Sequence, residues 1–149
     1  MTEVRFYHLT RTRLENALPQ MLEKTLSRGQ RAVVRAGSEE RLEALNAWLW
    51  TYRDRSFLPH GSAKDGYAEL QPVWLTLADE NPNGAQVLFL TDGTSAESLA
   101  DFTLCADLFD GTDDAAVTAA RARWSACKEG GHEVTYWRQT EQGGWEQAG

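Results

Sequence analysis

The segment at residues 4–36, VRFYHLTRTRLENALPQMLEKTLSRGQRAVVRA, decides the fold of this chain. Its aromatic and β-branched start, Val4–Leu9, predicts a strand, and the short apolar run Arg31–Ala36 predicts a second, buried strand. Between them, apolar side chains recur at three- and four-residue steps over Thr12–Arg28, which predicts a helix that Gly29 ends. A strand, a helix and a strand in this order form the unit from which parallel α/β sheets are built.

The rest of the chain continues this alternation. Ser38 is a candidate N-cap of a second helix, whose apolar face consists of Leu42, Leu45, Trp48 and Leu49. Further strands are expected at residues 73–77, 86–90, 104–109 and 134–137, and a third helix is expected at Asp113–Lys128. The sequence therefore predicts an α/β fold of three layers, in which a mostly parallel, mixed central sheet is flanked by helices on both faces.

Length and charge narrow the class of protein. With 149 residues the chain is expected to form a single domain over residues 1–149, of which residues 142–149 are a partly loose tail. The net charge is −7 and no basic run exceeds two residues. Strong autonomous binding to duplex DNA draws on clustered Lys and Arg, so we expect any contact with DNA to be indirect.

The chain carries no sign of membrane insertion or export. No apolar run approaches the roughly 20 residues that span a bilayer, and the N-terminus lacks the basic segment and apolar core of a secretion signal. We expect a cytoplasmic protein. Cys105 and Cys127 form no CxxC pattern and are expected to be reduced and buried.

Catalytic and cofactor motifs are absent from the sequence. It contains neither GxGxxG nor GxxxxGK[ST], and the first expected turn, Leu9–Thr12, has no glycine to let a phosphate approach. His8, His60 and His132 fall in different expected elements without the spacing of metal ligands. We therefore expect no catalytic residue, no metal and no cofactor.

An aromatic patch is expected after the second helix. It consists of Trp50, Phe57, Leu58, Pro59 and His60. Aromatic anchors beside a proline are typical of protein interfaces, and Pro59 biases Leu58 toward an extended backbone. The alternative is that Phe57 and Leu58 tuck under the edge of the sheet as ordinary core. The residues alone leave both readings open.

A basic stripe is expected on the third helix. Arg121, Trp124 and Lys128 recur at three- and four-residue steps, and Arg123 flanks the same turn. Two cations that bracket an indole suit a carboxylate lying next to an apolar side chain. The alternative is a solvated face whose arginines form exposed ion pairs of ~0–1 kcal/mol each.

Trp50 followed by Phe57-x-Pro59-His60, after the Phe6-Tyr7 strand, resembles the chi subunit of bacterial DNA polymerase III, the HolC family. The resemblance implies a Rossmann-like sheet without phosphate-binding loops. It implies a non-catalytic accessory subunit in DNA replication that links the clamp-loader assembly to single-stranded DNA-binding protein. The partner's acidic C-terminal tail, which ends in Pro-Phe, would bind Arg121, Trp124, Lys128 and Arg123.

The same resemblance implies that the aromatic patch binds the psi subunit, the clamp loader or a helicase. Other members carry further basic residues where this chain has Val117 and Ser125, so a weaker or relocated tail site is also consistent with the sequence. Two alternatives from other classes stay open. One is a nucleotide- or small-molecule-binding α/β enzyme, and the other is a homo-oligomeric adaptor that hides the aromatic patch against itself.

Overall fold

A computed structural model describes residues 2–51, 60–62, 66–96, 99, 101–142 and 144–148 of the chain. The side chains of Trp50 and Thr51 lie outside this description, although their backbone closes a helix. Within the described part, no helix is both long enough and apolar enough to cross a membrane.

The structure confirms the expected strands and helices to within a residue or two at their ends. The helices are α1 (Leu14–Ser27), α2 (Glu39–Thr51) and α3 (Asp114–Glu129), with a short 3₁₀ turn η1 (Ala68–Leu70). The strands are β1 (Glu3–Leu9), β2 (Ala32–Arg35), β3 (Gly61–Ser62), β4 (Val73–Thr76), β5 (Val87–Leu90), β6 (Leu104–Asp110), β7 (Glu133–Gln139) and β8 (Trp145–Gln147).

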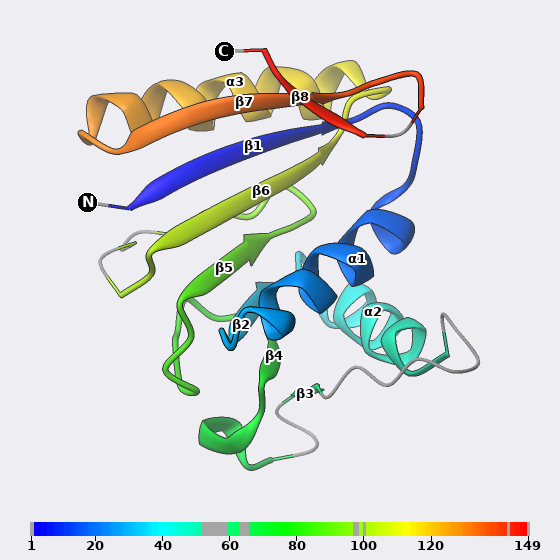
Figure 1. The fold of residues 1–149 in the computed structure, drawn as a ribbon, viewed down its shortest axis with the longest axis vertical. Helices are drawn as coiled ribbons and strands as arrows, with labels where there is room; N and C mark the ends of the chain where they lie inside the picture. Colours follow the sequence, from blue (N-terminus) through cyan, green and yellow to red (C-terminus); the bar gives the residue numbers. More distant parts are fainter. Residues whose placement is uncertain are drawn as a thin grey trace.

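The described strands form one sheet in the order β3-β4-β2-β5-β6-β1-β7-β8. All neighbouring strands run parallel except β7 and β8, which are antiparallel. Helices α1 and α2 lie over one face, and α3 lies over the other (Figure 1). The expected fold class, a mostly parallel mixed sheet with helices on both faces, is confirmed.

Each face of the sheet has its own hydrophobic core. On the α1–α2 face, Leu18, Leu22 and Leu45 pack against Val34 and Leu108, and all five are at most 2% exposed. On the α3 face, other side chains of the strands form the second core, and Ala120 of α3 packs against them. Strands β4 and β5 are buried at every position, because a parallel sheet covered on both faces has no solvent side.

The chain leaves the sheet in opposite directions at two neighbouring strands. After β1 it enters α1 on one face, and after β6 it enters α3 on the other, while β1 and β6 pair directly. In open α/β sheets such a switch opens a crevice at the carboxyl ends of the strands, where ligands commonly bind. This crevice is therefore a candidate binding site.

Within residues 142–149, for which a partly loose tail is expected, the structure contains a strand. Trp145–Gln147 form β8, which pairs with β7 at the edge of the sheet. The Trp145 ring packs edge-on against Tyr7, with ring centroids 4.9 Å apart. This apolar contact anchors a strand that the sequence around it, rich in Gly and Gln, does not suggest.

Candidate functional site

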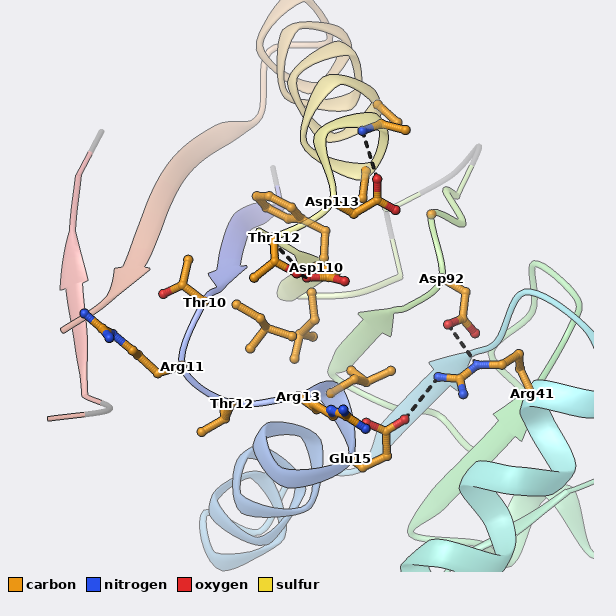
Figure 2. A pocket seen from close by; sticks show the side chains of 18 of the residues that line it. Thr10, Arg11, Thr12, Arg13, Glu15, Arg41, Asp92, Asp110, Thr112 and Asp113 are labelled. Carbon is orange, nitrogen blue, oxygen red and sulfur yellow. Dashed lines mark hydrogen bonds and ion pairs between the residues drawn. The ribbon is translucent and has the colours of Figure 1, made fainter. Parts of the chain in front are cut away.

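The crevice at the switch point is a cavity of about 890 Å³ between the β1–α1 and β6–α3 loops (Figure 2). Charged side chains of both signs line it, and some of them form ion pairs. Arg41 lies between Asp92, at 3.2 Å, and Glu15, at 3.6 Å. Asp110 accepts hydrogen bonds from the backbone and hydroxyl of Thr112, which lower the pKa of its carboxyl.

Backbone donors at the start of this crevice are already occupied. The N–H groups of Thr10, Arg11 and Thr12 all donate to Oε1 of Gln139, at 2.9, 2.7 and 3.2 Å. The Gln139 amide donates in turn to Oγ1 of Thr12 at 2.8 Å. Successive backbone N–H groups at this loop hold phosphate in nucleotide-binding sheets. Here a side chain that is only 6% exposed takes the place of the phosphate.

Gln139 is a residue that the sequence analysis missed. From the missing glycines the sequence analysis expects no phosphate loop here, but it gives no reason for the shape of the loop. Because Gln139 lies 127 to 129 residues from the amides that it binds, no local pattern reveals the contact.

Arg123 of α3 lines the crevice and is bound to a buried carboxylate. Its Nε is 2.6 Å from Oδ2 of Asp107 and its Nη2 is 3.0 Å from Oδ1, a two-pronged contact. The two side chains are 14% and 3% exposed. Burial raises the pKa of the Asp107 carboxyl, and the guanidinium lowers it by less. The structure thus directs Arg123 into the sheet rather than toward Arg121.

The other members of the expected basic stripe are accessible. Arg121 and Lys128 are exposed on α3, and Lys128 Nζ lies 5.3 Å from the centroid of the Trp124 ring. The partly buried indole packs edge-on against Phe6 and Tyr136, with centroids 5.7 and 5.9 Å away. The core therefore fixes the ring in position, while a cation lies over it.

Strand β7 adds two residues to this surface that the sequence analysis did not include. Tyr136 contacts Trp124, and the pKa of its phenol is raised by burial and lowered by the charges of Arg138 and Arg121. Arg138 is exposed on the same face of β7 as Tyr136. We call Arg121, Trp124, Lys128, Tyr136 and Arg138 the α3–β7 surface. Recognising it from sequence would have required the position of β7 beside β1.

The aromatic patch is only partly described. Phe57, Leu58, Pro59 and the side chain of Trp50 lie outside the described residues. His60 is 4% exposed, and its Nε2 lies 3.1 Å from the backbone oxygen of Asn46 in α2. This contact ties His60 to α2, and the imidazole is buried rather than presented on the surface.

The remaining candidate ligands and nucleophiles lie apart. Cys105 is buried and Cys127 half-buried, both thiols are free, and burial raises the pKa of each. His8 hydrogen-bonds through Nδ1 to the hydroxyl of Tyr136. Across the described ranges, no three His, Cys, Asp or Glu side chains converge as metal ligands.

Fold and site together define a class: a Rossmann-like α/β protein whose phosphate position is filled by its own glutamine, with cations and aromatic rings gathered on α3 and β7. The family described as DNA polymerase III chi subunit, HolC, matches residues 1–135. The chain belongs to this family, and the resemblance stated from sequence is confirmed.

A curated relative supports the same assignment. A protein of Rickettsia prowazekii (strain Madrid E), named "Probable DNA polymerase III subunit chi", is 32% identical over 94 residues. The match covers 63% of this chain and 57% of the relative, so the chain aligns with less than two-thirds of that protein's length.

Proposed function

We propose that this chain is a non-catalytic accessory subunit of the DNA polymerase III holoenzyme in the cytoplasm. It links the clamp-loader assembly to single-stranded DNA-binding protein by binding the acidic C-terminal tail of that protein. The observation that carries the proposal is the α3–β7 surface, where Lys128 lies over the Trp124 ring and Arg121 is exposed on the same helix.

Charge and shape assign a role to each residue of this surface. The tail's terminal carboxylate pairs with Arg121 or Lys128, and its Phe ring packs against the accessible part of Trp124. A surface contact between an ammonium and an aromatic ring is worth about 0.5–1 kcal/mol, so Lys128 can leave the indole when a carboxylate arrives. Charge then steers the tail, and the apolar anchor slows its release.

Arg138 extends the cationic surface onto β7. It pairs in register with Glu146 of β8, whose carboxylate competes with an incoming acidic peptide. The chain has a net charge of −7, but on this surface three cations lie around two aromatic rings and make it locally positive. This local charge favours an acidic partner.

A fluorescent tail peptide tests the site by anisotropy titration. Arg121→Ala is expected to weaken binding by about 1.5–3 kcal/mol, because it removes a hydrogen bond to a charged group. Arg28→Ala is the matched control, since it removes the same charge from the C-cap of α1, and α1 lies over the other face of the sheet (Figure 1). Equal affinity of Arg121→Ala and wild type would remove Arg121 from the site.

The second contact in this proposal is the aromatic patch, which binds psi, the clamp loader or a helicase through Trp50, Phe57, Leu58 and Pro59. Its support is the match of this motif to the family, and His60 anchors the end of the segment. Phe57→Ala is expected to fold normally and to lose co-purification with the clamp loader. A large fall in the melting temperature would instead make Phe57 a core residue.

The alternatives have their own tests. The occupied amides of the β1–α1 loop disfavour a nucleotide-binding enzyme. A thermal-shift screen against nucleotides tests this alternative, because a ligand at one hundred times its dissociation constant stabilises the folded protein by about 2.7 kcal/mol. Sedimentation of the free chain distinguishes a homo-oligomeric adaptor from a monomer.

A further inference from the structure

One side of the sheet has little helical cover on the face that carries α1 and α2. These helices lie over the β2–β5–β6 side and Tyr7 and Leu9 of β1 belong to the core there, whereas no described helix lies over β7 (Figure 1). Parallel sheets are normally covered on both faces, so the uncovered strand calls for an explanation. Between α1 and the β7–β8 hairpin lies a groove of about 560 Å³.

Aromatic rings form the floor of this groove. Tyr7 stacks on Trp137 with centroids 6.3 Å apart and planes at 24°, and Trp145 meets Tyr7 edge-on. The Trp137 indole donates to Oγ1 of Thr135 at 2.9 Å, which holds the ring along its strand. Both tryptophans are partly exposed. The two indoles are therefore held in position and accessible from the groove, while Tyr7 beneath them is buried.

Cations lie over the rings and along the rim. The guanidinium carbon of Arg5 is 5.5 Å from the centroid of Trp137. Lys24 and Arg28 are exposed at the end of α1, line the same groove, and form no ion pair with any described residue. Arg5 also pairs with Glu3 at 3.1 Å, where both side chains are about one-third exposed, 32% and 34%.

We propose that this groove binds single-stranded DNA, with bases packed on Trp137, Trp145 and Arg5 and with phosphates beside Lys24 and Arg28. Base stacking on aromatic rings and guanidinium planes suits any sequence, and it needs few phosphate contacts. That chemistry is compatible with a chain of net charge −7, which lacks the broad basic surface that duplex binding requires.

The polar rim favours a nucleic acid over an apolar partner helix. Besides the cations, Asn16, Gln20 and Gln142 line the groove. A helix that completed the layer would bury these groups without assured partners, whereas bases and phosphates offer donors and acceptors to each. The groove lies on the opposite face of the sheet from α3, so a test of this proposal does not depend on whether the tail site is correct.

Anisotropy of a labelled oligothymidylate of about 15 nucleotides, at about 50 mM salt, tests the groove. Trp137→Leu is expected to weaken binding at least about fivefold, as the loss of one stacked base predicts. Glu3→Gln is expected to tighten binding, because it frees Arg5. Arg121→Ala, on the far face, is expected to leave the affinity unchanged. If three cations contact phosphates, the logarithm of the binding constant should fall with the logarithm of the salt concentration with a slope of about −2.

A second variant keeps the test decisive if Trp137→Leu fails to fold. Lys24→Gln with Arg28→Gln changes only exposed positions near the end of α1 and should weaken binding while leaving the melting temperature close to wild type. The proposal is overturned if wild type does not bind the oligonucleotide, if this double variant binds as tightly as wild type, or if duplex DNA binds as well as the single strand.

Discussion

At the scale of single residues, Gln139 has the largest effect on what this protein can bind. Its side-chain oxygen satisfies three consecutive backbone N–H groups at the carboxyl end of β1, the position at which related folds hold phosphate. A glutamine next to a turn looks like an ordinary polar residue in the sequence. Its role becomes visible only once β7 is placed beside β1.

Two substitutions of Gln139 separate packing from hydrogen bonding. Gln139→Leu keeps the approximate volume but leaves the three donors without their acceptor, so the free energy of unfolding is expected to fall by about 1–3 kcal/mol. Gln139→Glu keeps an acceptor and adds a charge that backbone N–H groups stabilise. Its stability at neutral pH should therefore stay near wild type. Urea denaturation measures both.

The glutamate variant also has a pH signature. Hydrogen bonds from the three N–H groups hold the pKa of the new carboxyl below its unfolded value, so the stabilisation is present above the unfolded pKa. It should be lost as the pH falls through the folded pKa. Equal stability of the leucine and glutamate variants at neutral pH would contradict this role for Gln139.

At the scale of elements, the sequence placed α3 correctly but could not assign every side chain on it. The expected helix Asp113–Lys128 agrees with the observed α3, and its Ala120 packs against the sheet, where it is 1% exposed. The sequence analysis placed Arg123 beside Arg121 and Lys128 as a further cation for a ligand. In the structure the buried carboxylate on β6 takes its guanidinium, and helical periodicity contains no information about a charge on another element.

The pair of Arg123 and Asp107 yields a pH-dependent prediction. Arg123→Met leaves a buried carboxylate alone, and at neutral pH it is expected to cost about 3–5 kcal/mol of unfolding free energy. Burial already raises the pKa of Asp107, and losing the guanidinium raises it further. A raised folded pKa favours the protonated folded state, so this penalty should shrink as the pH falls toward the unfolded pKa.

Asp107→Asn combined with Arg123→Met is the control for this prediction. It removes the charge from both positions, so most of the stability should return and the excess pH dependence should disappear. Thermal melts of the three proteins at several pH values measure both effects. A destabilisation of Arg123→Met that stays constant with pH would mean that lost packing, not the stranded carboxylate, is responsible.

At the scale of the whole molecule, the alternation of strands and helices was sufficient to predict the layers. The family was predictable from the Phe6-Tyr7 strand together with Trp50 and the Phe57-x-Pro59-His60 motif. The order of the strands was not predictable, because four pairings in the described sheet, β2–β4, β2–β5, β1–β6 and β1–β7, join strands that are not consecutive along the chain. Both proposed binding surfaces depend on that order. Trp124 meets Tyr136, and Tyr7 meets Trp137, only because β7 lies beside β1.

The two proposed surfaces lie on opposite faces of one sheet, which predicts how their ligands affect one another. The acidic tail and the single strand share no residue, so saturating one should leave the other's affinity nearly unchanged. Both are anions, and salt of about 0.1 M limits repulsion to about 10 Å. At low salt, each ligand is therefore expected to lower the affinity for the other slightly, by less than the roughly fivefold change at which allosteric effects begin. This effect should vanish near physiological salt. Titrating the labelled tail peptide with and without saturating oligothymidylate measures this, and competition that persists at physiological salt would mean that both ligands use one surface.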